Sequence, residues 1–115
     1  MMNIFLICPV RNVTDEQRQE IREYVEVMES DGYEVHWPER DTNQDAKGID
    51  ICKQNALAIA DADEVHIWFD PSSKGSHFDL GVAFGLSKKL VVVRNVDYGP
   101  GKSFPRMIDE WQAEG

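Results

Sequence analysis

The chain has 115 residues, of which 42% are hydrophobic and 29% charged, and its formal net charge is −9. This length and composition are typical of one soluble globular domain, 1–115, and no apolar run approaches the roughly 20 residues that a membrane span needs. The negative charge argues against DNA or RNA polymers as partners, because their binding depends on basic residues that meet phosphates. The N-terminus has no basic leader, and two cysteines, Cys8 and Cys52, make neither a disulfide framework nor a zinc ligand set. We therefore expect a cytoplasmic protein without a metal, a cofactor or a membrane partner.

Short β-forming runs alternate with helical patterns along the chain. Strands are predicted over Asn3–Cys8, Tyr33–Trp37, Glu64–Phe69 and Leu90–Val93. Helices are predicted from the Thr14 and Gln17 capping pattern to Ser30, over Ile49–Ala60, from near Ser76 to Leu86, and over Phe104–Trp111. Glu39–Lys47 and Tyr98–Lys102 are predicted to be loops. This order favours a three-layer α/β sandwich with a parallel, flavodoxin-like (Rossmann-like) sheet of four to five strands.

The segment from Asp63 to Phe84 carries the strongest indication of a ligand site. An apolar strand is followed by Asp70 and Pro71, and then by a small polar loop that consists of Ser72, Ser73, Lys74, Gly75 and Ser76. Gly75 allows a close approach of the backbone, and the hydroxyls, Lys74 and a helix N-terminus supply donors for an anion. Because ligands bind beyond the carboxyl ends of parallel strands, we expect a site here, between the loops that contain Pro9, Pro38 and Pro71.

Two side chains of this segment could carry out chemistry. Asp79, in the predicted first helical turn, could attack a sugar carbon while the loop holds a phosphate, as in retaining glycoside cleavage. Alternatively, Ser76 and Asp79 form a capping box and the carboxylate only stabilises the helix. His77 could act as a general acid or base, or be an ordinary surface residue.

Three cations fall in loops that this topology brings to one edge of the sheet. Arg11 follows the first predicted strand, Arg40 the second and Lys74 the third. Together they could clamp a phosphate or a carboxylate, although each alone is only a surface cation.

Three segments carry a resemblance to a known family. They are FLICPVRN at Phe5–Asn12, AIADADEVHIW at Ala58–Trp68 and SKGSHFDLGVAFGLSKKLVVV at Ser73–Val93. Their most specific part is the pattern S-x-G-x-x-x-[acid]-x-G, which is matched by Ser73, Gly75, Asp79 and Gly81. The chain thereby resembles the nucleoside 2-deoxyribosyltransferase superfamily, which includes the 2′-deoxynucleoside 5′-phosphate N-hydrolases.

The resemblance implies a flavodoxin-like domain that cleaves the N-glycosidic bond of a nucleoside or nucleoside 5′-monophosphate, or exchanges its base. It implies a covalent glycosyl-carboxylate intermediate on Asp79, with Ser73 and Arg11 as ligands of the 5′-phosphate. It also implies a dimer or higher homo-oligomer in which the neighbouring subunit helps to line each site.

The sequence departs from the family at three positions. Asp79 stands where the family usually has glutamate, Asn55 where it has an aspartate that assists the leaving base, and Phe5 where it has tyrosine. His77, Asp50 or Asp70 could protonate the leaving base instead, or the chain is a non-catalytic nucleotide-binding sensor or scaffold. We assign Asp79, Asn55 and His77 to catalysis. The predicted substrate-binding residues are Phe5, Pro9, Arg11, Arg40, Asp70, Ser73, Lys74, Gly75 and Ser76.

Overall fold

The computed structural model describes residues 1–115 and contains one parallel sheet of four strands in the order β2-β1-β3-β4. The elements, in chain order, are β1 (Asn3–Ile7), α1 (Asp15–Ser30), β2 (Glu34–His36), α2 (Pro38–Asp41), α3 (Gly48–Asp61), β3 (Glu64–Trp68), α4 (Lys74–Gly85), β4 (Lys89–Arg94) and α5 (Phe104–Glu114). The strand order reverses direction at β1, which is the flavodoxin-like arrangement. The predicted fold class is therefore confirmed, with four strands.

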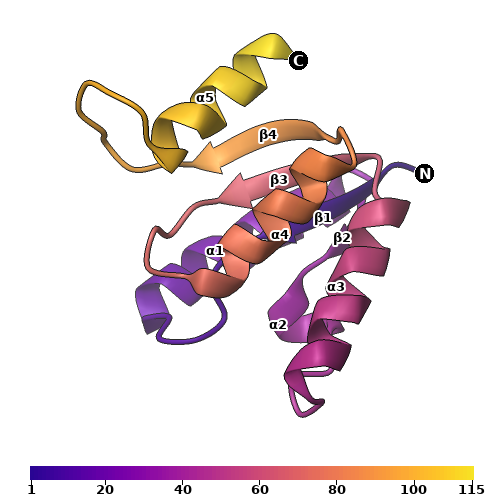
Figure 1. Cartoon of the computed structure of the whole chain (residues 1–115). Helices are drawn as coiled ribbons and strands as arrows, with labels where there is room; N and C mark the ends of the chain where they lie inside the picture. The colour runs from indigo at the N-terminus through magenta and orange to yellow at the C-terminus, as the bar shows by residue number, and fades with distance from the viewer.

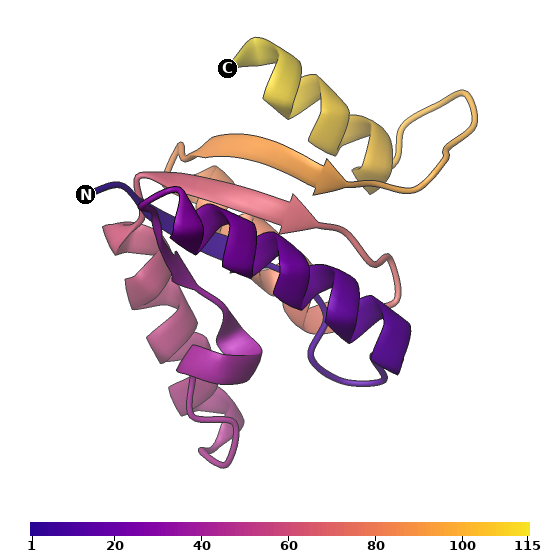
Figure 2. The ribbon, with the colours of Figure 1, turned by 180° about the vertical axis from the view of Figure 1, so that it is seen from behind.

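Helices cover both faces of the sheet and make three layers. α3 and α4 lie on the face seen in Figure 1, and α1 lies on the opposite face, seen in Figure 2, while α5 runs beside the outer strand β4. Alternate side chains of β1 enter the two cores: Phe5 and Ile7 pack with residues of α3, α4 and α5, whereas Ile4 and Leu6 pack with Ile21 of α1. A strand that is buried on both faces explains the continuous apolar run in the sequence.

The helix boundaries confirm one predicted cap and correct two other predictions. Thr14 caps α1 together with Gln17, as predicted. The segment after Pro38 was predicted to be a loop, but it begins with the short helix α2, in which Pro38 occupies the first turn. α4 begins at Lys74, before the predicted start near Ser76, because the Ser73 side chain caps it. None of the five helices combines the length and the apolar character that a membrane span requires.

Candidate active site

A cavity of about 430 Å³ opens beyond the carboxyl ends of β1 and β3. The loops that follow β1, β2 and β3 contribute to its walls, together with the N-terminal parts of α3 and α4. The lining residues are Cys8, Val10, Arg11, Asn12, Pro38, Gln44, Gly48, Ile51, Cys52, Asn55, Ser72, Ser73, Lys74, Gly75, Ser76 and Asp79. This is the edge of the sheet at which parallel α/β proteins bind ligands, and the edge that the sequence predicted.

The N-terminus of α4 forms one wall of the cavity. Ser73 caps the helix, and its Oγ accepts a hydrogen bond of 3.2 Å from the Ser76 backbone N–H. The first turn contains no acidic residue, so nothing offsets the positive end of the helix dipole. The hydroxyl proton of Ser73 is not used by the cap and can be donated to a ligand.

Two cationic side chains without an ion-pair partner lie beside this helix end. Arg11 and Lys74 line the cavity, and neither forms an ion pair or a side-chain hydrogen bond within the chain. Free cations next to unpaired backbone N–H groups make this end of the cavity suited to an anion.

Asp79 lies on the second turn of α4, with its side chain buried in the cavity wall. Only 6% of the residue is exposed, and its one side-chain partner is the Nδ2 of Asn55, at 3.5 Å from Oδ2. Burial raises the pKa of Asp79 from 3.8 to about 7, while the Asn55 hydrogen bond acts in the opposite direction. The capping alternative for Ser76 and Asp79 is wrong, because Ser73 is the cap.

Asn55 and Ser76 are the other buried polar residues of the cavity. The Asn55 Oδ1 accepts a hydrogen bond of 2.7 Å from the Thr42 hydroxyl, so its amide is shared between Thr42 and Asp79. The Ser76 Oγ is buried and has no partner. A buried hydroxyl without a partner carries a desolvation cost, which a ligand in the cavity can remove.

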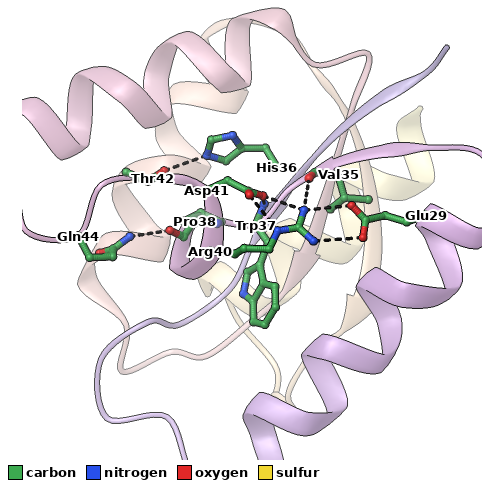
Figure 3. Close-up of polar contacts among 9 residues, drawn as sticks. All are labelled: Glu29, Val35, His36, Trp37, Pro38, Arg40, Asp41, Thr42 and Gln44. Carbon is green, nitrogen blue, oxygen red and sulfur yellow. Dashed lines mark hydrogen bonds and ion pairs between the residues drawn. The ribbon is translucent and has the colours of Figure 1, made fainter.

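Arg40 does not join Arg11 and Lys74 at the cavity. Its guanidinium group faces the other way, toward Glu29 of α1 at 3.0 Å, Asp41 at 2.8 Å and the Val35 carbonyl at 2.9 Å, as Figure 3 shows. These bonds raise the pKa of Arg40, chiefly through Asp41. Arg40 faces away from the cavity because it belongs to α2, which turns the chain back immediately after β2. The prediction that Arg40 contacts a phosphate is therefore corrected to a structural role.

Four further predicted residues lie outside the cavity lining. Phe5 is fully buried and stacks on His36, and Pro9 is buried as well. Asp70 accepts hydrogen bonds from the N–H and hydroxyl of Ser72, and so shapes the turn after β3. His77 donates from Nδ1 to the Ser73 carbonyl, at 2.7 Å, and its ring packs between two phenylalanines, Phe69 and Phe104. The structure therefore does not bring His77 to the Asp79 carboxyl.

The cavity also contains residues that sequence reasoning missed. Both cysteines line it, Cys8 directly after β1 and Cys52 on α3. Burial raises the pKa of the Cys8 thiol, and the neighbouring Glu39 and Asp79 carboxylates add to the effect. The helical spacing of Cys52 and Asn55 could have indicated that they share a face of α3.

Several solved structures share this fold at low sequence identity. The 2-deoxyribosyltransferase of the psychrotolerant bacterium Bacillus psychrosaccharolyticus has a TM-score of 0.70 and 16% identity, over 95% of this chain and 81% of that chain. The CMP N-glycosidase BcmB of Clostridium botulinum has a TM-score of 0.62 and 22% identity, over 78% of this chain and 69% of that chain. The 2-desoxiribosyltransferase of Leishmania mexicana has a TM-score of 0.63 and 21% identity, over 80% of this chain and 63% of that chain. No protein-family model matches the sequence, and a search of curated proteins finds no match. The likeness shows a common flavodoxin-like fold.

Proposed function

We propose that this chain cleaves the N-glycosidic bond of a nucleoside or nucleoside 5′-monophosphate, with hydrolysis or base exchange as the outcome. The observation that carries the proposal is the buried carboxyl of Asp79, which faces a cavity that also presents two unpaired cations and a free helix N-terminus. The fold shared with a CMP N-glycosidase and two deoxyribosyltransferases supports this choice of substrate class.

Asp79 acts as the nucleophile in this mechanism. Its carboxylate attacks C1′ of the sugar, the bond between C1′ and the base nitrogen breaks, and the electron pair leaves with the base, which takes up a proton. Water or a second base then attacks C1′ and releases the Asp79 carboxylate. With a pKa of about 7, a substantial fraction of Asp79 is ionised at neutral pH, and a buried carboxylate is poorly solvated and therefore reactive.

The anion-binding end of the cavity takes the 5′-phosphate. Arg11 and Lys74 supply charge, the Ser73 hydroxyl and the first N–H groups of α4 supply hydrogen bonds, and all three side chains line the cavity. On the same helix, Asp79 follows Ser73 by six residues, or about 9 Å along the axis at 1.5 Å per residue. Both residues line the same cavity, so a phosphate held at Ser73 and a sugar that reaches toward Asp79 can occupy it together.

We also propose that two copies of the chain associate through the outer faces of α3 and α4, which lie next to each other in Figure 1. Large apolar side chains are exposed there, among them Leu57 of α3 at 68% and Phe78 of α4 at 47%. α4 carries no exposed carboxylate, and those of α3, Asp50 and Asp61, stand in its first and last turns, so two copies of a protein with net charge −9 can meet along the middle of this face with little repulsion. Analytical ultracentrifugation should detect a dimer that Leu57→Asp dissociates. A monomer at micromolar concentration would contradict this proposal.

One observation favours the second candidate, a nucleotide-binding sensor. Asp79 is the only carboxyl residue that lines the cavity, and the neighbouring Asn55 amide cannot give up a proton. A sensor would use Arg11, Lys74 and the α4 N-terminus for binding, and it would need no leaving-group acid.

The experiment that separates the two candidates is incubation with a panel of nucleosides, ribo- and deoxyribonucleoside 5′-monophosphates and NAD, followed by chromatography for free base. Wild type, Asp79→Asn and Arg40→Gln are compared, and thermal shift reports binding in each mixture. The proposal predicts base release that Asp79→Asn abolishes and Arg40→Gln preserves, because Arg40 lies outside the cavity. Stabilisation by a nucleotide without base release from any mixture would favour the sensor.

A further inference from the structure

A line of hydrogen bonds leads from β2 to the Asp79 carboxyl. The Nε2 of His36 lies 2.8 Å from the Thr42 Oγ1, as Figure 3 shows. The same Thr42 hydroxyl lies 2.7 Å from the Asn55 Oδ1, and the Asn55 Nδ2 is 3.5 Å from the Asp79 Oδ2. Thr42 and Asn55 are buried, at 4% and 8% exposed, so water does not readily replace these bonds.

The chemistry of the groups fixes the direction of this line. The Asn55 Oδ1 can only accept, so the single proton of the Thr42 hydroxyl is donated to it. The Thr42 oxygen must then accept from His36, whose Nε2 carries the proton. With Oδ1 held by Thr42, the Asn55 amide turns its N–H₂ group to Asp79. Every donor in the line therefore points toward the carboxyl.

The fold holds the first member of the line in place. His36 is the last residue of β2, and its backbone pairs in register with Phe5 of β1. The Phe5 ring stacks on the imidazole, with centroids 5.3 Å apart and planes 12° from parallel. Phe5 does not line the cavity. It orients His36, which hydrogen bonds connect to the cavity residues Asn55 and Asp79.

We propose that His36 and Thr42 are positioning residues, which hold the Asn55 amide so that it donates to Asp79. The catalytic meaning of this inference rests on the proposed function. A donor facing Asp79 stabilises the carboxylate that attacks C1′, and partly offsets the cost of burying its charge. In the reversed orientation the Asn55 carbonyl would face Asp79 and favour the protonated carboxyl, which is not a nucleophile.

Substitutions at Thr42 test the inference with a matched pair. Thr42→Val keeps the shape of the side chain and removes the hydroxyl, whereas Thr42→Ser keeps the hydroxyl. We expect Thr42→Val to lower kcat for base release about tenfold, the scale of one net hydrogen bond, with little change in KM, and Thr42→Ser to retain wild-type kcat. His36→Gln, whose amide can donate in place of Nε2–H, should retain kcat better than His36→Leu. Equal kcat for Thr42→Val and Thr42→Ser would overturn the inference, provided that both variants melt cooperatively.

Two NMR measurements test whether His36 and Thr42 orient the Asn55 amide, even if the chain releases no base. At about pH 8 the His36 imidazole is neutral, because burial lowers its pKa, and ¹⁵N shifts should show the proton on Nε2. A proton on Nδ1 with a bare Nε2 would mean that the line runs in the opposite direction, and would overturn the proposal.

The second measurement follows the Asp79 carboxyl by ¹³C NMR as the pH is changed. Loss of the oriented donor should raise the pKa of Asp79 in Thr42→Val but not in Thr42→Ser. The charged and titratable groups that share the cavity are Arg11, Lys74, Cys8 and Cys52, and neither substitution alters them. The same Asp79 titration in both variants would show that Thr42 does not act on the carboxyl.

Discussion

Replacing Asp79 with asparagine should stabilise the protein, and more so at high pH. The folded state raises the pKa of Asp79 from 3.8 to about 7, so between these values the unfolded chain has released a proton that the folded chain still holds. The free energy of unfolding therefore falls as the pH rises through this window, and the loss is complete above about pH 7. At 1.36 kcal/mol per pH unit, Asp79 costs about 2 kcal/mol of stability at pH 5.5 and about 4 kcal/mol at pH 8.5. Asp79→Asn removes this cost and preserves the shape of the side chain.

Urea unfolding of wild type and Asp79→Asn at these two pH values measures the effect. The gain from the substitution should grow by about 2 kcal/mol between pH 5.5 and pH 8.5, whatever constant change in packing it also causes. Leu80→Val, a buried neutral change at the next position of α4, is the control, because its cost should not change with pH. A gain from Asp79→Asn that is the same at both pH values would refute a raised pKa of the folded-state carboxyl.

Four further outcomes follow from the site. Arg11→Ala and Lys74→Ala should each weaken binding of nucleoside 5′-monophosphates about tenfold or more in calorimetry, and leave nucleosides little affected, because each removes a charged phosphate ligand. Ser76→Ala should raise the free energy of unfolding by about 1 kcal/mol in urea titrations, since the hydroxyl that it removes is buried without a partner. Arg40→Gln should lower the free energy of unfolding by about 1 kcal/mol, because the contacts with Glu29 and Asp41 are lost, and it should leave KM unchanged. A raised KM would show that Arg40 takes part in substrate binding. The rate constant kcat/KM should rise about tenfold per pH unit below about pH 7 and then level off, as Asp79 ionises; a flat profile would exclude it as the ionising nucleophile.

The sheet could be predicted from sequence because its strands give strong local signals. The run from Ile4 to Ile7 is continuously apolar, since alternate residues enter the cores on the two faces. The α2 helix could not be predicted in the same way. Its three polar residues, Glu39, Arg40 and Asp41, carry no periodic pattern. Pro38, which was predicted to end a strand, is also favoured in the first turn of a helix.

The candidate site was predictable where it depends on the segment after β3, and not where it depends on the path of the chain after β2. Ser73, Lys74, Gly75 and Ser76 are consecutive, so the cap and first turn of α4 place them together at the cavity. Arg40 was expected at the same edge, but its position depends on α2 and on ion pairs with α1 that no local pattern reveals.

The line from His36 to Asp79 joins four parts of the chain, and no spacing in the sequence indicates it. His36 ends β2, Thr42 follows α2, Asn55 belongs to α3 and Asp79 to α4. The short helix α2 brings Thr42 back to His36, and the packing of α3 and α4 on the same face of the sheet brings Asn55 to Asp79.

Detection of a glycosyl ester on Asp79 would identify this residue directly as the nucleophile. The protein is mixed with the substrate that the panel identifies, quenched in acid within one turnover, and digested for peptide mass spectrometry. We predict a pentosyl adduct, carrying phosphate if the substrate is a monophosphate, on the peptide that contains Asp79, and no adduct in Asp79→Asn. Base release with no adduct on Asp79 at any quench time, or an adduct on a different residue, would show that Asp79 is not the nucleophile.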